Sequence, residues 1–242
     1  MSQTMSTIPR RSFLAAAACA VAPRSSGRQT AHRADDGIRL ALAAYSYRDH
    51  LQGQLQPSMT LFDVVDETAS LGLAGLELTE YYFPRPLDMD WVLKLKNHCH
   101  RRGVEIVGAP MKTEFTHPAG PARDRELEVL RSWLEVAAVL GAPTIRVFAG
   151  SPQPGQDTEG AVRCCIETLT LAAAAASQRG VILALENHGG IVAESAPLIS
   201  IVKAVDSPWC GINLDSGNFR TTDPYDDFDR CAELAVAVQF KP

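Results

Sequence analysis

Short apolar segments alternate strictly with helical segments along most of the chain, and this alternation constrains the fold more than any other feature. Six segments have apolar residues at helical spacing, and most of these end at a glycine. Between and around them lie seven apolar segments with the length and composition of buried strands, at residues 40–47, 74–80, 104–109, 143–148, 181–185, 210–214 and 235–241. The pattern predicts a parallel α/β sheet, either open or closed into a barrel.

Two further features favour the barrel. No G-x-G-x-x-G follows the first apolar segment, so a dinucleotide-binding fold has no support. Short connections and polar residues at most strand ends are typical of a (β/α)₈ TIM barrel. With seven strands and six helices in residues 37–242, we predict an incomplete barrel that lacks strand eight and two helices. Its unpaired edges and uncovered apolar faces would invite aggregation.

Composition excludes several classes of function. The chain has 242 residues and a net charge of −5, and no basic cluster lies in the body of the chain, so no nucleic-acid groove is expected. No apolar run reaches the ~18 residues of a membrane span. The six cysteines are scattered without a C-x-x-C pair, which indicates buried thiols rather than a zinc site or a disulfide framework.

The N-terminal residues form a separate region. Pro-Arg-Arg-Ser-Phe-Leu at residues 9–14 precedes a mildly apolar, alanine-rich run, and the pair Ala18 and Ala20 offers an A-x-A cleavage site. This arrangement resembles a twin-arginine export signal over residues 1–22, followed by a disordered linker at 23–36. It predicts export to the periplasm or cell envelope; a basic tail with a chance arginine pair is the alternative.

Two carboxylates mark the candidate site. Glu186 directly follows the apolar segment 181–185 and is followed by Asn, His and two glycines, and Asp215 directly follows the segment 210–214. Parallel strands all end on the same face of a barrel, so both acids should point into one mouth. We predict that both are metal ligands, the alternative being strand-end acids that cap the next loop.

Further candidate residues stand at or near other strand ends. Gln239 is a candidate third ligand through its carbonyl oxygen, and an ordinary core hydrogen-bonding role is its alternative. The residues predicted to contact substrate are His188, Glu80, Asn218 and Lys241. For Glu80, and for Glu77 in the same strand, the alternative is pairing with a neighbouring Arg or Lys. The alternatives are a loop histidine for His188, a turn residue for Asn218 and a carboxylate partner for Lys241.

Three motifs carry a resemblance to a known family. They are Leu-Ala-Leu-Glu-Asn-His at 183–188, Asn-Leu-Asp-Ser-Gly-Asn at 213–218 and Val-Gln-Phe-Lys at 238–241. From about residue 40 to 241 the chain resembles the xylose-isomerase-like sugar isomerase/epimerase superfamily, which includes inosose dehydratases and the endonuclease IV type. With its leader, it looks like the exported members of this group.

The resemblance implies a divalent-metal site. In the family, a strand-five Glu and a strand-six Asp ligate one metal, with a His on strand seven and a Glu on strand eight. Here Glu186 and Asp215 match the first two, Gln239 stands in place of the His, and the strand-eight Glu has no counterpart. An all-oxygen site favours Mn²⁺ or Mg²⁺ over Zn²⁺. The endonuclease type is disfavoured because the His expected after Asp215 is absent.

The activity implied is isomerisation or epimerisation of a sugar or keto-sugar through an enediolate. A metal polarises the carbonyl and acidifies the adjacent C–H, and a carboxylate, with Glu186 as the candidate, moves the proton. The predicted partner is a small carbohydrate, and homo-oligomer formation is a further prediction. A keto-sugar dehydratase or lyase of the inosose dehydratase kind, and an inactive fragment or decayed copy of such an enzyme, remain as alternatives.

Overall fold

The structure is a computed structural model that describes residues 38–241. The predicted export signal (residues 1–22) and linker (23–36) lie outside the described residues, so both stay predictions. Contacts group residues from Arg39 onward into one unit, which is the unit described below. In this part of the chain, no helix is long and apolar enough to cross a membrane.

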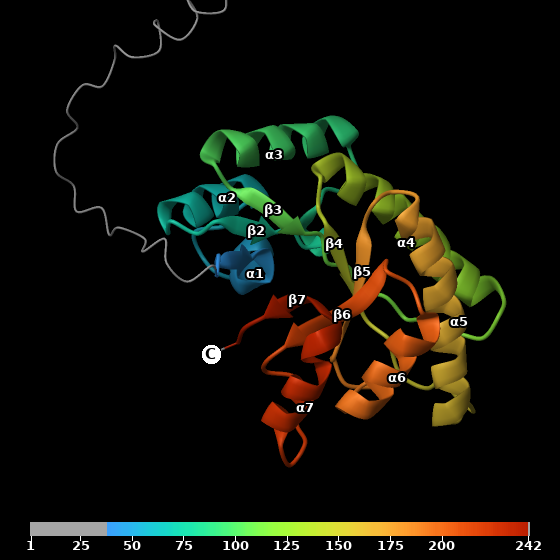
Figure 1. Cartoon of the computed structure of the whole chain (residues 1–242). Coiled ribbons are helices and arrows are strands. Elements are labelled where there is room, and N and C mark those ends of the chain that lie inside the picture. The colour runs from blue at the N-terminus through green and yellow to red at the C-terminus, as the bar shows by residue number, and fades with distance from the viewer. Residues whose placement is uncertain (1–37, 242) are drawn as a thin grey trace, which may run out of the picture. The chain divides into compact units, whose positions relative to one another are not determined.

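Seven parallel strands form the centre of the fold (Figure 1). The first sheet has the order β1-β2-β3 and the second has the order β4-β5-β6-β7. Their bounds are β1 Ala41–Ala43, β2 Gly75–Glu77, β3 Glu105–Gly108, β4 Thr144–Val147, β5 Ile182–Glu186, β6 Cys210–Asp215 and β7 Ala235–Gln239.

Backbone hydrogen bonds join the two sheets just beyond the end of β3. Ala109 N donates to Thr144 O at 2.9 Å, and Met111 N donates to Arg146 O at 3.0 Å. The strands therefore follow one another from β1 to β7 in sequence order, as in a TIM barrel. This confirms the predicted fold class, and each strand ends on the same side of the sheet.

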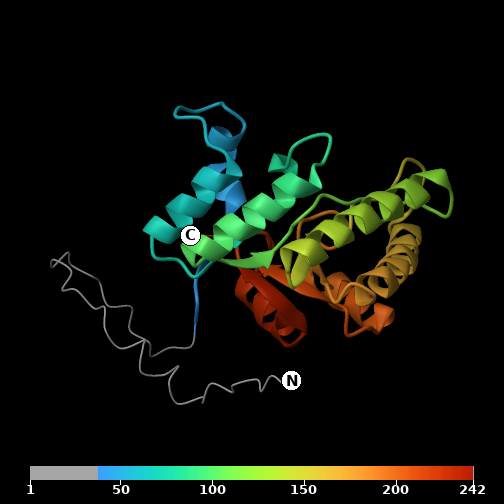
Figure 2. The same cartoon turned by 90° about the horizontal axis from the view of Figure 1, so that it is seen from above.

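Helices connect successive strands on the outside of the barrel (Figures 1 and 2). From α2 to α7, each helix packs against the next one in the chain. Thr60 begins α2 with a capping box, in which its side chain and that of Asp63 each accept from the other's backbone N–H. The α-helices are α1 Arg48–Leu51, α2 Leu61–Ser70, α3 Met89–Arg102, α4 Pro121–Leu140, α5 Thr158–Ser177, α6 Ser195–Val205 and α7 Pro224–Cys231.

The structure differs from the sequence-based expectations at the first two strands. The segment predicted as a strand at 40–47 is a strand only over Ala41–Ala43, because Ala44–Tyr47 forms a 3₁₀ turn that leads into α1. This one-turn helix makes seven α-helices rather than six among the described residues. Similarly, the second predicted strand ends at Glu77, and Glu80 begins another 3₁₀ turn. Apolar composition alone does not distinguish a strand from such a turn.

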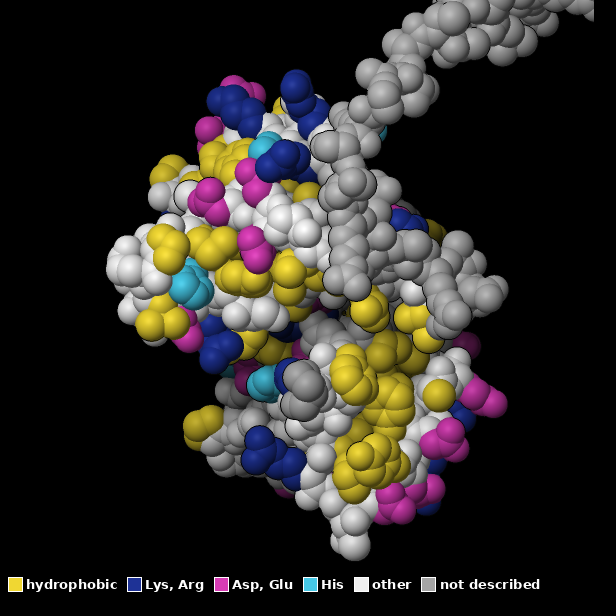
Figure 3. Space-filling model, turned by 90° about the vertical axis from the view of Figure 1, so that its left-hand side faces the viewer, with side chains coloured by type: hydrophobic (Ala, Val, Ile, Leu, Met, Phe, Trp, Pro, Cys, Tyr) yellow, Lys and Arg dark blue, Asp and Glu magenta, His cyan; other side chains and the backbone are white. Residues whose placement is uncertain are grey.

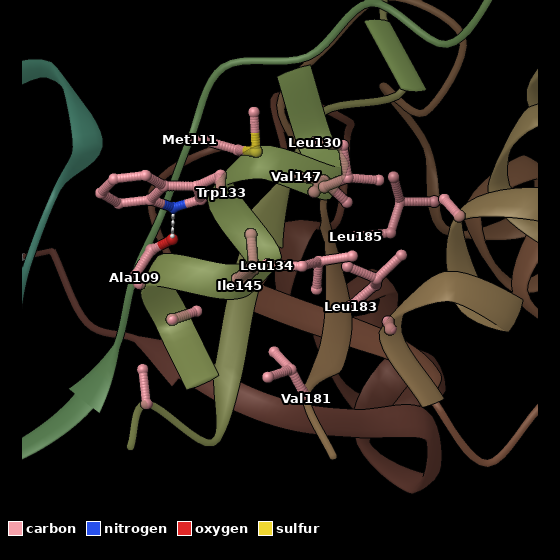
Figure 4. Packing of buried hydrophobic residues seen from close by; sticks show 14 of the residues in the cluster. Ala109, Met111, Leu130, Trp133, Leu134, Ile145, Val147, Val181, Leu183 and Leu185 are labelled. Atoms are coloured by element: carbon pink, nitrogen blue, oxygen red, sulfur yellow. Dashed lines mark hydrogen bonds between the residues drawn. The ribbon is translucent and has the colours of Figure 1, made fainter. Parts of the chain in front are cut away.

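The core between the sheets and the outer helices is continuous, and Figure 4 shows part of it. One face of α4 is apolar and buried, and it includes Leu130, Trp133 and Leu134. Trp133 Nε1 donates to Ala109 O at 2.8 Å, and its ring packs edge-on against Phe83 with the centroids 4.9 Å apart. This hydrogen bond ties α4 to the junction of the two sheets.

Replacing Trp133 by Phe is expected to lower the free energy of unfolding by about 2 kcal/mol, because the Ala109 carbonyl loses its indole donor and the core loses volume. Urea denaturation measures the change. Trp91→Phe is the matched control, since Trp91 is only half-buried and packs against the same Phe83 ring. Equal losses in the two variants would show that the Trp133 hydrogen bond does not contribute.

One side of the barrel is open among residues 38–241. No described strand pairs with the outer edge of β7 or of β1, and these residues contain no eighth strand. Val238 on β7 is 62% exposed, and Phe240 just beyond it is 83% exposed. Figure 3 views the molecule from the left-hand side of Figure 1, where the C-terminus lies, and shows hydrophobic side chains gathered on that face.

The cysteines agree in most cases with the expectation of buried thiols. All five described cysteines are free, and four of them are buried, whereas Cys164 is half-buried. Burial raises the pKa of the Cys165 and Cys210 thiols to about 12. These two buried thiols are therefore protonated at neutral pH.

Candidate active site

Strand register places the polar side chains of β5, β6 and β7 on one face. Glu186 pairs with Asn213, and Asp215 pairs with Gln239. Neighbours in register point to the same side of a sheet, as do residues two apart along a strand. Gln239 also contacts Glu77 of β2, which lies in the other sheet, so this shared face is the barrel interior. Glu186, Asn213 and Asp215 are all buried there.

Glu186 lies between a cation and an amide. Its Oε2 is 2.8 Å from Arg146 Nε, and its Oε1 accepts from Asn218 Nδ2 at 2.7 Å. Burial raises the pKa of Glu186 to about 7, and Asp215 and Glu77 also act to raise it, while Arg146 opposes the shift. A carboxyl group with a pKa near 7 is suited to both accepting and returning a proton at neutral pH.

Asp215 is fully buried, and its two oxygens have different surroundings. Oδ1 accepts from Gly217 N at 2.9 Å. Oδ2 has the Lys241 ammonium at 2.6 Å but no partner in hydrogen-bonding geometry. Lys241 Nζ also donates to Asn218 Oδ1 at 3.0 Å, so Lys241 and Asn218 connect Asp215 to Glu186.

The loop after β5 is held against β6 by a side-chain amide. Asn187 Nδ2 donates to Asp215 O at 2.9 Å, and Asp215 N donates to Asn187 Oδ1 at 2.8 Å. Gly190, at φ 56°, lies so close to the Gly150 carbonyl that a Cβ atom would collide with it. The sequence after Glu186 therefore fixes the loops around the mouth, which explains why an amide and two glycines follow the carboxylate.

His188 forms part of the wall of the mouth. Its ring centroid is 4.2 Å from that of Phe148, and the Arg146 guanidinium also lies over the Phe148 ring, at 4.1 Å from the centroid. Burial, then the nearby Arg146 charge, lower the pKa of His188. The neutral imidazole is thereby favoured, so His188 can both donate and accept a hydrogen bond.

Glu77 and Gln239 meet across the barrel interior. Gln239 Nε2 donates to both Glu77 oxygens, at 2.8 and 3.1 Å, and Gln239 Oε1 accepts from Asn213 Nδ2 at 3.2 Å. Burial raises the pKa of Glu77, while Arg146 and the Gln239 hydrogen bond act against the increase. Both ends of the Gln239 amide are thus engaged with protein groups.

The structure brings together five of the residues predicted from the sequence, namely Glu186, Asp215, Gln239, Asn218 and Lys241. His188 joins them through Phe148 and Arg146. Glu80 is different, because its carboxylate forms an ion pair with Arg85 in the segment after β2, which was the alternative interpretation of this residue. The roles of all seven as ligands or substrate contacts stay predictions.

Sequence reasoning missed two members of this cluster, Arg146 and Asn213, and gave Glu77 no role in the site. A charged residue inside the apolar run Thr-Ile-Arg-Val was the available signal for Arg146. Asn213 likewise interrupts the apolar segment 210–214. A polar residue inside a buried strand needs partners, so each of these positions indicated an internal polar network.

The side-chain oxygens at this site are of the kind that hard divalent cations prefer, although Arg146 and Lys241 already pair with the two carboxylates. Among the described residues, no three His, Cys, Asp or Glu side chains are grouped as a metal site. The oxygens at hand are the carboxylates of Glu186 and Asp215 and nearby amide carbonyls, and such ligands suit Mg²⁺ or Mn²⁺. Asp215 Oδ2 is buried without a hydrogen-bond partner and already faces a positive charge, that of Lys241.

The fold and the strand-end carboxylates define a barrel of the α/β class with a polar mouth. A model of the xylose isomerase-like TIM barrel family matches residues 65–241, and the chain belongs to this family. A search of curated proteins found no match to the sequence.

Solved structures share the fold at low sequence identity. The probable 3-DHS dehydratase AsbF of Bacillus anthracis, involved in petrobactin synthesis, is 16% identical with a TM-score of 0.69, over 83% of this chain and 72% of that one. D-psicose 3-epimerase with D-tagatose, from Clostridium cellulolyticum H10, is 15% identical with a TM-score of 0.71, over 84% and 73%. The IOLI protein with a bound zinc atom is 14% identical with a TM-score of 0.63, over 76% and 64%.

Proposed function

We propose that the protein is a divalent-metal-dependent isomerase or epimerase of a sugar or keto-sugar, acting through an enediolate. The observation that carries the proposal is the buried pair of Glu186 and Asp215 at the ends of adjacent strands. Glu186, with a pKa of about 7, faces the same mouth as Asp215 Oδ2, which is ion-paired with Lys241 but has no partner in hydrogen-bonding geometry. A sugar epimerase among the solved structures with this fold, D-psicose 3-epimerase, supports the proposal.

Glu186 and Asp215 would hold the metal, with Gln239 as the third predicted ligand. When bound, the metal supplies Lewis acidity that polarises a substrate carbonyl and acidifies the C–H beside it. We infer Mn²⁺ or Mg²⁺ from the oxygen donors, whereas zinc is the metal in the IOLI structure. The metal's identity is therefore part of the test below.

The chain's own residues supply the proton transfer and the binding contacts. Glu186 accepts the proton from carbon and returns it, which is general acid–base catalysis worth roughly 10²–10⁴-fold in rate. The charges of Arg146 and Lys241 stabilise the negative oxygen that develops on the substrate. His188 and Asn218 offer hydrogen bonds to sugar hydroxyls at the rim.

A keto-sugar dehydratase is the second candidate, and Lys241 favours it. Elimination of water needs an acid that protonates the departing hydroxyl group. The Lys241 ammonium is half-exposed at the mouth and is linked through Asn218 to Glu186, so acid and base stand on one hydrogen-bonded path. The similarity of the fold to that of AsbF, a probable 3-DHS dehydratase, supports this second candidate.

Mn²⁺ is expected to stabilise the wild-type chain against heat, because a ligand that binds only the folded state raises its stability. At 100 times the dissociation constant, the gain is about 2.7 kcal/mol. Differential scanning fluorimetry with Mn²⁺, Mg²⁺ and Zn²⁺ measures the shift in Tm. Asp215→Ala is expected to lose the shift.

The matched control is Glu167→Gln, which removes an exposed carboxylate paired with Arg123 on the outer helices and should leave the shift unchanged. Retention of the full shift in both Asp215→Ala and Glu186→Ala would place the metal elsewhere. If no divalent ion shifts the Tm of the wild-type chain although it melts cooperatively, the metal-dependent function is wrong for this protein.

A further inference from the structure

A line of three polar side chains crosses the barrel interior from β2 to β6. Glu77 accepts from Gln239 Nε2 at 2.8 and 3.1 Å, and Gln239 Oε1 accepts from Asn213 Nδ2 at 3.2 Å. Asn213 is fully buried, and its Oδ1 atom, at the end of this line, has no hydrogen-bond partner. We call Glu77, Gln239 and Asn213 the amide relay.

The relay has a direction, because an amide has a donor end and an acceptor end. Glu77 accepts, so Gln239 must turn its NH₂ group toward Glu77 and its carbonyl toward Asn213. Asn213 must then donate with its own NH₂ group, which leaves its carbonyl facing the other way. Both Glu77 oxygens lie within reach of Gln239 Nε2, so protonation of one oxygen leaves the other to accept.

The free carbonyl of Asn213 belongs to the same face as the two candidate ligands. Asn213 stands two residues before Asp215 on β6 and beside Glu186 of β5 in register. Asp215 Oδ2 on the same face is ion-paired with Lys241 at 2.6 Å, whereas Asn213 Oδ1 has neither an ion pair nor a hydrogen-bond partner. A buried oxygen without a partner is costly, so the free Asn213 carbonyl beside these carboxylates indicates that a ligand satisfies it.

We propose that Asn213 Oδ1 is an additional oxygen ligand of the divalent cation held by Glu186 and Asp215, and that Glu77 is a positioning residue that turns this oxygen toward the cation through Gln239. This inference rests on the proposed function, because it concerns the same cation. It gives Gln239 a part in orienting Asn213 that is separate from direct ligation. The general reason is that outer partners of a ligand fix its orientation.

Mn²⁺ alone is the probe, and its binding to the full chain is followed by the loss of the free-ion electron paramagnetic resonance signal. Asn213→Leu removes the proposed ligand and Glu77→Met removes the outer partner that positions it, and each is expected to weaken Mn²⁺ binding roughly tenfold or more. Asn213→Ser serves as a second, smaller change if the leucine variant does not unfold cooperatively. Glu105→Gln, which alters an exposed carboxylate on β3, is the matched control.

A double-mutant cycle separates orientation from a merely structural effect. A carboxylate at position 213 presents oxygen at both ends and needs no orientation. In the Asn213→Asp background, Glu77→Met should therefore leave Mn²⁺ affinity unchanged within about twofold, in contrast to its effect in the wild-type background.

The outcomes distinguish this inference from the proposed function. Unchanged Mn²⁺ affinity in both Asn213→Leu and Asn213→Ser overturns the ligand assignment and leaves the metal-dependent function standing. Equal weakening by Glu77→Met in the two backgrounds overturns the positioning role. A wild-type chain that binds neither Mn²⁺, Mg²⁺ nor Zn²⁺ overturns both the inference and the proposed function.

Discussion

Glu186→Gln is expected to lower the rate of proton exchange at the carbon beside a keto-sugar carbonyl roughly 10³-fold, within the range for loss of a general base. The glutamine keeps an oxygen that can accept from Asn218, so the shape of the site is retained while the ability to take a proton is lost. Incubation of ketohexoses in deuterated water, followed by proton NMR, measures this exchange whichever product the enzyme forms.

The same experiment separates the two candidate reactions. An isomerase or epimerase incorporates deuterium into a recovered sugar, whereas a dehydratase forms an unsaturated ketone that absorbs in the ultraviolet. Glu167→Gln on the outer surface serves as the control and should exchange protons at the wild-type rate. Wild-type exchange by Glu186→Gln would assign the base to another residue, and Glu77, half-buried in the barrel interior, is the other described carboxylate with a raised pKa.

The overall architecture was predictable because its signals are local. The apolar face of α4, and glycines such as Gly141, which ends α4 at φ 78°, can be recognised from a few neighbouring residues. The first strand was predicted too long, because Ala44–Tyr47 is apolar enough for a strand and yet forms a 3₁₀ turn. Strand and turn can have the same apolar composition, so composition alone does not choose between them.

The candidate site was predictable where chemistry and strand ends coincide, as at Glu186 and Asp215. Its long-range partners were not, because contacts such as Gln239 with Glu77 join residues from opposite ends of the chain. Arg146 stands in a strand that gave only the hint of a charge among apolar neighbours. In the structure Glu77 contacts the interior network and Glu80 pairs with Arg85, and the predicted substrate contact of Glu80 stays a prediction.

The metal-free wild-type chain is expected to lose stability as the pH rises from about 4.5 to about 7, because burial raises the pKa of Glu186 in the folded state to about 7. In the unfolded chain this carboxyl group returns to its ordinary pKa of 4.5. Between the two values the folded state holds the proton and the unfolded state releases it. Stability from this group is therefore present at low pH and is lost as the pH rises through 7.

The expected loss is up to about 3 kcal/mol, since each unit of pKa difference corresponds to about 1.4 kcal/mol and Glu186 is almost completely buried. Urea denaturation at several pH values, in the presence of a chelator, gives the free energy of unfolding of the wild type and of Glu186→Gln. The prediction concerns the difference between the two chains in how this free energy changes with pH. Glu77 shifts in the same direction and is present in both chains, so its own contribution cancels in the comparison apart from its interaction with Glu186.

Saturating Mn²⁺ should reverse the pH dependence of stability. The metal-bound folded state holds Glu186 as a carboxylate, so this group then has a lower proton affinity in the folded state than in the unfolded chain. The stability of the loaded protein is thus expected to increase with pH over the same interval. If the free energy of unfolding changed with pH equally in wild type and Glu186→Gln without metal, Arg146 would be keeping the Glu186 carboxylate ionised at all these pH values. Glu186 would then be a ligand and an ion-pair partner, and the base would have to be another group.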